Sequence, residues 1–238
     1  MDDQSNTKAR SVGADRLRVS GFFRSLAAGD LADLAAHAEF IDVPARGCVV
    51  RHGDPADALI IVERGHVILF LGERGDPNGI ARVAGPGELF GEASLLKHAA
   101  SPVTAQAFEP CSLIRIPAEP VRALIEQRFD VMMALLGYMS VRLRKILLQL
   151  MDLKMKTTTQ RLGSYLCSLT AAGEGPAELK LPYDRSLLAA ELGMQPETFS
   201  RAMMKLQTVG VRDGGTGESV VVQDIGALRR FCEGEGEE

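Results

Sequence analysis

Six polar residues toward the C-terminal end of the sequence carry side chains that can contact DNA, and three of them can read base edges. They are Gln195, Glu197, Thr198, Ser200, Arg201 and Lys205. The Arg201 guanidinium can bond O6 and N7 of guanine together, and the Glu197 carboxylate can accept a hydrogen bond from N4 of cytosine. Ser200 is small enough to leave room for a base or a thymine methyl group. These residue types indicate a surface that reads the major groove of DNA.

Each of these residues alone has a simpler interpretation. Glu197 is a favourable acid for the first turn of a helix, and Arg201 is an ordinary solvated charge. The DNA-reading hypothesis therefore depends on the elements that hold the six residues together on one face.

Two short helices are predicted here, over residues 185–192 and 196–209, with a three-residue turn between them. Ala189 is small enough to lie where the two helices touch, and Gly193 tolerates the positive φ that a sharp turn requires. Pro196 suits the first position of a helix, where a missing N–H group is harmless. The spacing predicts a helix-turn-helix.

The segment after these helices predicts a β-hairpin, formed by residues 211–212 and 220–222 around a glycine-rich turn. Phe199, Met203 and Leu206 would pack inward from the second helix, which leaves the six polar residues facing outward. Helix, turn, helix and hairpin together are typical of a winged helix-turn-helix, whose second helix enters the major groove.

The first half of the chain has the opposite character, because short β-type runs separated by glycine and proline follow one short predicted helix in residues 22–40. Residues 58–62 and 67–71 flank a four-residue turn and predict a hairpin. Further runs occupy residues 80–83, 103–108 and 112–116. Their regular spacing predicts a β sandwich or jelly roll.

A long helix is predicted between the two regions, over about residues 120–153. Its apolar residues repeat at alternating steps of four and three, which is a heptad pattern. They are Met132, Leu136, Met139, Leu143, Ile146, Leu150 and Leu153. The stripe is compatible with an ordinary amphipathic core helix and with the seam of a homodimer. Its length and its place between two different regions favour the seam.

Composition and short motifs limit the classes of protein to which the chain can belong. The chain has 238 residues, 46% of them hydrophobic, and a net charge of −4, as expected of a globular protein whose basic surface is local. Its four cysteines form no CxxC pair, so we expect reduced thiols in a cytoplasmic protein. No apolar run approaches the ~20 residues of a membrane span. No P-loop, GxSxG or HExxH motif occurs, so an enzyme is not expected.

The predicted class is α+β with five parts in order. These are a flexible N-terminus (1–20), a β-roll sensor domain (21–119), a dimerisation helix (120–155), a winged helix-turn-helix (156–232) and an acidic tail (233–238).

With these residues in view, the chain resembles the CRP/FNR superfamily of bacterial transcription regulators. Residues 195–201 (QPETFSR) are similar to the E-x-x-S-R recognition helix of the FNR-type branch, and residues 85–92 (GPGELFGE) resemble part of the cyclic-nucleotide-binding fold. The resemblance implies a homodimer that binds a palindromic TTGAT-like site in double-stranded DNA and contacts RNA polymerase. Pro196 stands where CRP-type proteins carry an arginine, so a CRP-type half-site is not expected.

The resemblance also narrows the effector. Glu92 matches the family's ribose-binding glutamate, but Ser101-Pro102 stands where an arginine would hold the cyclic phosphate, so we expect no cyclic AMP. No cysteine precedes Cys48, so we expect no iron–sulfur cluster. Gly91 and Ala93 replace the haem ligands of the carbon-monoxide sensors.

Residues 103–107 (VTAQA) and the recognition helix look like those of the DNR/HcpR-like nitrosative-stress branch, which implies nitric oxide sensing through haem b in an apolar pocket. The implied pocket residues are Leu69, Leu89, Glu92, Leu95, Leu96, Met133 and Tyr138. The candidate haem ligands are His37, His66 and His98, ahead of Tyr138 and the methionines. A turn histidine such as His66 is also simply explained as solvated. The competing function is a cyclic-nucleotide-binding module that acts through protein partners.

Overall fold

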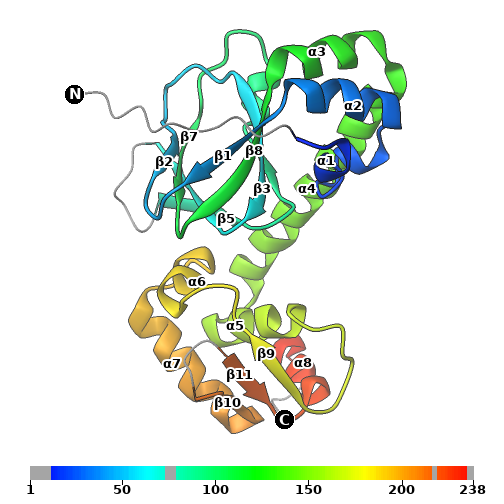
Figure 1. The fold of residues 1–238 in the computed structure, drawn as a ribbon. Coiled ribbons are helices and arrows are strands. Elements are labelled where there is room, and N and C mark those ends of the chain that lie inside the picture. The colour runs from blue at the N-terminus through cyan, green and yellow to red at the C-terminus, as the bar shows by residue number, and fades with distance from the viewer. Residues whose placement is uncertain (1–11, 73–78, 216–218, 235–238) are drawn as a thin grey trace, which may run out of the picture. The chain divides into compact units, whose positions relative to one another are not determined.

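The structure is a computed structural model that describes residues 12–72, 79–215 and 219–234. The chain forms two compact units, one up to Arg142 and one from Leu143 onward (Figure 1). The predicted α+β class is confirmed, with a β domain first, a long helix next and a helix-turn-helix with a small sheet last.

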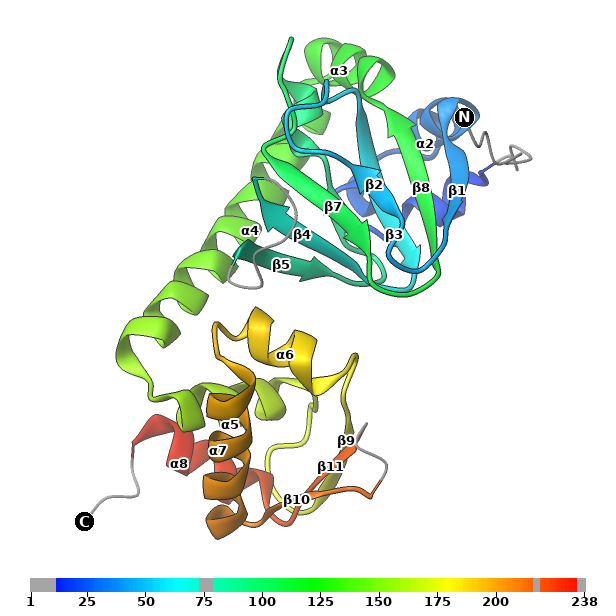
Figure 2. The ribbon, with the colours of Figure 1, turned by 90° about the vertical axis from the view of Figure 1, so that its left-hand side faces the viewer.

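The first unit is built on two antiparallel sheets. Their strands are β1 (Glu39–Val43), β2 (Cys48–Val50), β3 (Ala58–Arg64), β4 (Val67–Leu71), β5 (Ile80–Ala84), β6 (Leu89–Phe90), β7 (Val103–Ala107) and β8 (Cys111–Pro117). One sheet has the order β1-β8-β3-β6, and the other has the order β2-β7-β4-β5 (Figure 2). This arrangement is the predicted jelly roll.

Strand β3 explains why its sequence is continuously apolar rather than alternating. Ile60 and Val62 point into the core between the two sheets. Leu59 and Ile61 point to the other side, where the helices of the unit cover the sheet. Both faces of β3 are therefore buried, and both need apolar side chains.

The predicted hairpin of residues 58–62 and 67–71 is wrong. Strand β3 pairs with β8 and β6, whereas β4 pairs with β7 and β5 in the other sheet. A strand that is apolar on both faces must lie between two layers that bury those faces. The strands that pair with its two edges lie far from it in the sequence.

Helices cover the outer face of the β1-β8-β3-β6 sheet (Figure 1). They are α1 (Ala14–Leu17), the 3-10 helix Phe23–Ser25, α2 (Ala28–His37), α3 (Ala118–Gln127) and the start of α4 (Phe129–Met155). Leu17, Phe22 and Phe23 are fully buried in this layer. The segment expected to be flexible up to residue 20 is thus folded from Val12 onward, because its apolar side chains complete the core. Residues 1–11 and most of the acidic tail lie outside the described residues.

The predicted single helix of residues 120–153 is two helices. Arg128 is extended between α3 and α4, with φ −124° and ψ 106°. Its guanidinium binds both carboxylate oxygens of Asp130, at 3.0 and 2.8 Å, and Asp30 at 3.2 Å. These side-chain contacts accompany the break, and no proline or glycine stands there to predict it.

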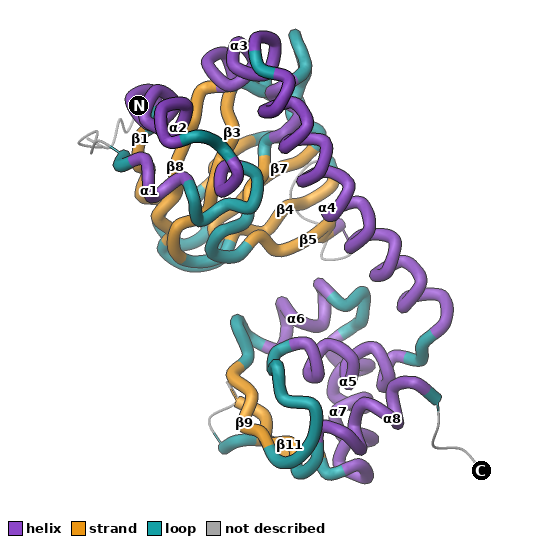
Figure 3. Tube along the Cα trace, turned by 90° about the vertical axis from the view of Figure 1, so that its right-hand side faces the viewer, coloured by secondary structure: helices purple, strands orange, loops and turns teal. Residues whose placement is uncertain are grey.

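The second unit contains α5 (Thr158–Ser168), β9 (Ala177–Lys180), α6 (Arg185–Glu191), α7 (Pro196–Leu206), β10 (Val211–Asp213), β11 (Ser219–Val222) and α8 (Ile225–Glu233). The strands form a small sheet of order β10-β11-β9, which lies to one side of the helices (Figure 3). Leu162 of α5, Phe199 of α7 and Leu228 of α8 share one apolar core. This core fixes α7 within its unit.

Candidate nucleic-acid interface and effector site

The turn between α6 and α7 has the predicted local geometry. Asp184 caps α6 by accepting a hydrogen bond from the Leu187 N–H at 2.8 Å. Gly193 adopts φ +64°, and the Met194 N–H donates to the Ala189 carbonyl at 2.8 Å. Ala189 is fully buried where the helices meet. The left-handed turn is one that glycine adopts without strain.

Helix α7 buries one side and exposes the other. Pro196 occupies its start, and Phe199, Met203 and Leu206 are buried. The residues predicted to contact DNA occupy the rest of the helix and its cap. Gln195, Glu197, Ser200, Arg201 and Lys205 are exposed, and Thr198 is half-buried.

Two of these side chains are turned back on their own helix. The Ser200 hydroxyl donates to the Pro196 carbonyl at 3.0 Å, and the Arg201 Nε donates to the Glu197 carbonyl at 3.4 Å. Both groups must rotate outward to reach a base edge. Both are exposed, so that rotation meets no packed neighbour.

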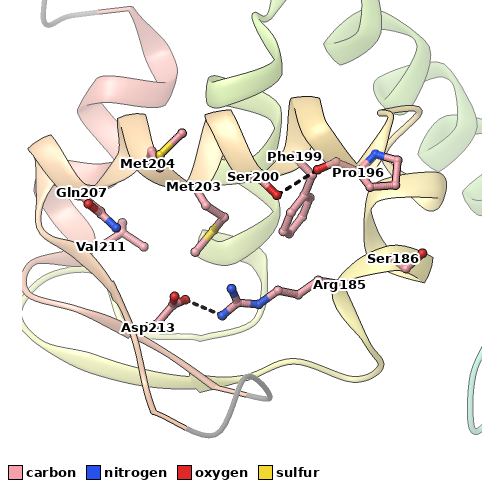
Figure 4. Close-up of a pocket in the computed structure, with 10 residues that line it drawn as sticks. All are labelled: Arg185, Ser186, Pro196, Phe199, Ser200, Met203, Met204, Gln207, Val211 and Asp213. Atoms are coloured by element: carbon pink, nitrogen blue, oxygen red, sulfur yellow. Dashed lines mark hydrogen bonds and ion pairs between the residues drawn. The ribbon is translucent and has the colours of Figure 1, made fainter.

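A small cavity of about 290 Å³ lies between α7, α6 and β10 (Figure 4). Phe199 and Met203 point into it from α7. Arg185 at the start of α6 forms an ion pair with Asp213 of β10, which connects the first helix of the motif to the wing. The hairpin β10–β11 is paired as predicted, from Val211 opposite Val222 to Asp213 opposite Val220.

Among the described residues, the heptad stripe of α4 is largely left exposed. Six of its seven side chains are exposed, with exposed fractions from 37% to 57%, and Met139 is half-buried. They are Met132, Leu136, Leu143, Ile146, Leu150 and Leu153. An ordinary core helix would bury such a stripe, so the exposure favours a surface that another molecule covers.

Glu92, which the resemblance matches to a ribose-binding glutamate, faces a cation that the sequence did not predict. Arg142 of α4 forms an ion pair with Glu92 and donates from Nη1 to the Leu89 carbonyl at 3.2 Å. Burial, together with the nearby charge of Arg82, lowers the pKa of Arg142 to about 10, so Arg142 stays charged at neutral pH. In the sequence Arg142 looks like one more surface charge of a basic helix.

A second ion pair lies beside the first. Arg82 of β5 binds Glu88 at 3.2 Å and donates to the Leu89 carbonyl at 2.8 Å. Burial raises the pKa of the Tyr138 hydroxyl, and the charges of Arg82 and Glu88 have smaller, opposite effects on it. Arg142 therefore faces Glu92, and Arg82 pairs with the neighbouring Glu88, although the sequence position expected to supply the cation is Ser101-Pro102.

The predicted pocket residues do not form one wall. Leu69 is buried between the two sheets, whereas Leu89, Leu95 and Tyr138 belong to the separate layer of helices and sheet. Leu96 is 68% exposed. The first unit does have an apolar groove of about 600 Å³, between the first helices and α4. Of the predicted residues, only Met133 and Tyr138 line it.

None of the three candidate histidines lines that groove. His37 is exposed at the end of α2, and His98 is exposed in a loop with φ +60°. His66 is half-buried between β3 and β4, where its Nδ1 lies 2.7 Å from Glu109 Oε1. Among the described residues no cluster of three potential metal ligands occurs. No helix in the described ranges is both long and apolar enough to span a membrane.

Two domain families match the sequence. The cyclic nucleotide-binding domain matches residues 40–128, and the Crp-like helix-turn-helix domain matches residues 160–231. The Cyclic AMP receptor protein of Thermus thermophilus is 33% identical over 182 residues, which are 76% of this chain and 82% of that protein.

Solved structures are similar over nearly the whole chain. A Ruegeria pomeroyi protein described as cyclic nucleotide binding has a TM-score of 0.64 and 31% identity, covering 92% of this chain and 96% of its own. DNR of Pseudomonas aeruginosa has a TM-score of 0.51 and 28% identity, with 93% and 98% covered.

Proposed function

The chain belongs to the CRP/FNR family of DNA-binding transcription regulators, which are not enzymes, and we propose that it reads a palindromic promoter site as a homodimer. The observation that carries the proposal is the face of α7. Glu197, Ser200 and Arg201 are exposed together on its first half, whereas its apolar residues are buried. The first half of a recognition helix is the part that reaches base edges.

The half-site is TTGAT-like. The support is the similarity of residues 195–201 to the recognition helix of the FNR-type branch, with Pro196 immediately before Glu197. In this proposal residues 156–232 bind DNA in the cytoplasm, and the regulator contacts RNA polymerase there. Binding to phosphates would come from basic residues such as Lys205 and carry little sequence preference.

Dimerisation uses the stripe of α4. Its exposed apolar side chains, among them Leu136, Leu143 and Ile146, lie at heptad spacing on one helix. Burial of apolar surface is the dominant favourable contribution to most protein–protein association. Two copies paired along residues 120–155 would place two recognition helices about one DNA turn apart, ~34 Å.

The effector is a small molecule bound in residues 21–119 and sensed by α4. The nitrosative-stress resemblance, with the similarity to DNR, favours nitric oxide bound through haem b. Haem needs an axial ligand at its pocket. The apolar groove offers Met133 and Tyr138 but none of the candidate histidines. These residues do not fit a histidine-ligated haem, so no sensing step is derived through it.

An anionic effector of the cyclic-nucleotide type is the second candidate, favoured by Arg142 and Arg82 beside Glu92 and Glu88. Either arginine could exchange its carboxylate for a phosphate, which is a strong charge-assisted partner for a guanidinium. A ligand that separates Arg142 from Glu92 would act directly on α4, the helix that also carries the proposed seam. Ligand and DNA affinities would then be linked reciprocally.

DNA binding is tested by fluorescence anisotropy with a duplex that contains two inverted TTGAT half-sites, against the same duplex with the half-sites scrambled. We expect binding at least a hundredfold tighter to the palindrome, as is typical of specific over non-specific binding. Equal affinity for the two duplexes would refute the function.

The effector is tested separately. Calorimetry with cyclic AMP and cyclic GMP measures the anionic candidate, and a visible spectrum with added haem, with and without nitric oxide, measures the haem candidate. Heat of binding that disappears in Arg142→Ala supports the anion site. A Soret shift in the absence of any nucleotide binding would reverse the preference between the two candidates.

A further inference from the structure

Two of the four cysteines meet in the second unit, where α5 packs against α8. Cys167 lies in the last turn of α5 and is half-buried, and Cys232 lies in the last turn of α8 and is 4% exposed. The two thiols lie close enough for the protonation of each to affect the pKa of the other. Both cysteines are free thiols.

Gly163 makes this approach possible. It precedes Cys167 by one helical turn, so it lies on the same side of α5. A Cβ at position 163 would lie 2.5 Å from the Cys232 Sγ, which is closer than real atoms pack. Only a glycine here lets the sulfur of α8 lie directly against α5.

A chain of polar groups leads from a lysine to the sulfur pair. The Lys156 ammonium donates to the Ser164 hydroxyl at 2.9 Å and pairs with Asp152 at 3.0 Å, and the Ser164 hydroxyl in turn acts to lower the pKa of Cys232. Arg229 adds a second positive charge near Cys167, and Glu233 opposes it with a negative one. Positive charges beside a thiol favour its thiolate.

The two sulfurs consequently differ in protonation. The interaction with Cys232 outweighs burial and lowers the pKa of Cys167, with help from Arg229 and Lys156. The same interaction and burial raise the pKa of Cys232. Cys167 is therefore the sulfur that more readily becomes a thiolate, and Cys232 is the neighbouring thiol, as in a peroxide-sensing pair.

We propose that Cys167 and Cys232 form an oxidisable dithiol site at the α5–α8 contact, with a peroxide as the oxidant. The Cys167 thiolate attacks a peroxide oxygen, the O–O bond breaks, and hydroxide leaves as Cys167 becomes a sulfenic acid. The Cys232 sulfur then attacks the Cys167 sulfur. The S–S bond forms as the S–O bond breaks, and the leaving hydroxide takes the Cys232 proton as water.

Oxidation at this site acts on the unit that contains the recognition helix. Leu162 and Leu166 of α5 share the core of Phe199 and Met203 of α7. A disulfide would tie α5, which supports α7, to the last helix of the unit. The site is independent of the effector proposal, because it lies in the other unit.

The test uses the full chain with Cys48→Ser as background, because Cys48 is exposed and remote in sequence. The reduced protein is treated with hydrogen peroxide and analysed by thiol titration, intact mass and peptide mapping. We expect two thiols and two hydrogens to be lost, a peptide crosslinked from Cys167 to Cys232, and full reversal by dithiothreitol. Retention of all thiols, or a disulfide to Cys111, would overturn the proposal.

Two single variants separate the roles of the sulfurs. In Cys232→Ser the sulfenic acid at Cys167 has no resolving thiol, so dimedone should label it. In Cys167→Ser, Cys232 should remain unlabelled. Labelling of Cys232 in place of Cys167 would contradict the assignment.

Lys156→Met provides a check that leaves both thiols and the core intact. We expect oxidation of Cys167 at pH 7 to slow about twofold to threefold, because less thiolate is present and its greater nucleophilicity offsets only part of the loss. An unchanged rate would show that the polar chain does not activate the pair.

Discussion

Ser200 and Arg201 hold their polar groups against carbonyls of their own helix, at 3.0 and 3.4 Å. Such contacts satisfy the groups while no DNA is present. Both are local to one turn, so in the proposed function they would be exchanged for base contacts without disturbing the packing of α7. Base specificity would then depend on side chains that rotate over a fixed helix.

Arg201→Ala should cost about 1–3 kcal/mol of affinity for the specific duplex and relax base choice at one position, because it removes a bidentate guanine contact. Lys205→Ala is the matched control on the same face. As a phosphate contact, it should weaken specific and random duplexes alike and reduce the salt slope by about one. Anisotropy titrations at several salt concentrations measure both. Equal loss on both duplexes for Arg201→Ala would contradict base reading.

Asp224 predicts a pH effect on the same unit. Its carboxylate accepts hydrogen bonds from the Gly175 and Gly226 N–H groups, at 3.1 and 2.9 Å, which lowers its pKa. A lowered folded-state pKa gives stability that is present above the unfolded pKa of about 3.9 and is lost as the pH falls through the folded value.

The variant Asp224→Asn should still cap the start of α8, but it should remove the contribution of the carboxylate to the pH dependence of stability. Melting temperatures between pH 6 and pH 3 should converge for the two proteins as the pH falls. A constant difference over that range would mean that the carboxylate charge contributes nothing.

At the scale of elements, the helix-turn-helix could be predicted because its signals are local. Ala189, Gly193 and Pro196 lie within eight residues, and their backbone geometry follows from the residue types. The β3–β4 connection could not be predicted in the same way. The partners of β3 lie far along the chain, and its two-sided burial looks in sequence like one half of a hairpin.

The contact of Arg142 with Glu92 was missed for the same reason. It joins α4 to the segment after β6, and nothing near Arg142 in the sequence distinguishes it from the solvated cations around it. The heptad stripe could be predicted from the sequence. Its two interpretations, a core helix and a dimer seam, differ in whether the same chain or a second copy covers the stripe. The exposure of the stripe in the folded chain favours the seam.

Leu143→Lys should convert dimers to monomers, because pairing along α4 would bury an unpaired ammonium in the seam. Leu143→Met is the matched control, since it retains an apolar side chain of similar size. Light scattering of both variants at micromolar concentration measures the mass. A dimeric mass for Leu143→Lys, with native circular dichroism, would rule out this seam.

At the scale of the whole molecule, α4 is the element on which both proposed functions act. Val131 near its start belongs to the core of the first unit, and Arg142 farther along reaches Glu92. Residues from Leu143 onward belong to the second unit. A ligand that changes the Arg142 contact would therefore change the same helix that is proposed to pair two DNA-binding units, which would be the physical basis for coupling.

The proposed dimer presents two copies of α7 to two half-sites at fixed spacing. The decisive measurement inserts about five base pairs between inverted TTGAT half-sites spaced ~10 base pairs from centre to centre, which turns one half-site by half a helical turn. We predict that affinity falls to that of a single half-site, and that ten inserted base pairs restore part of it. Affinity that ignores the spacing would contradict the claim.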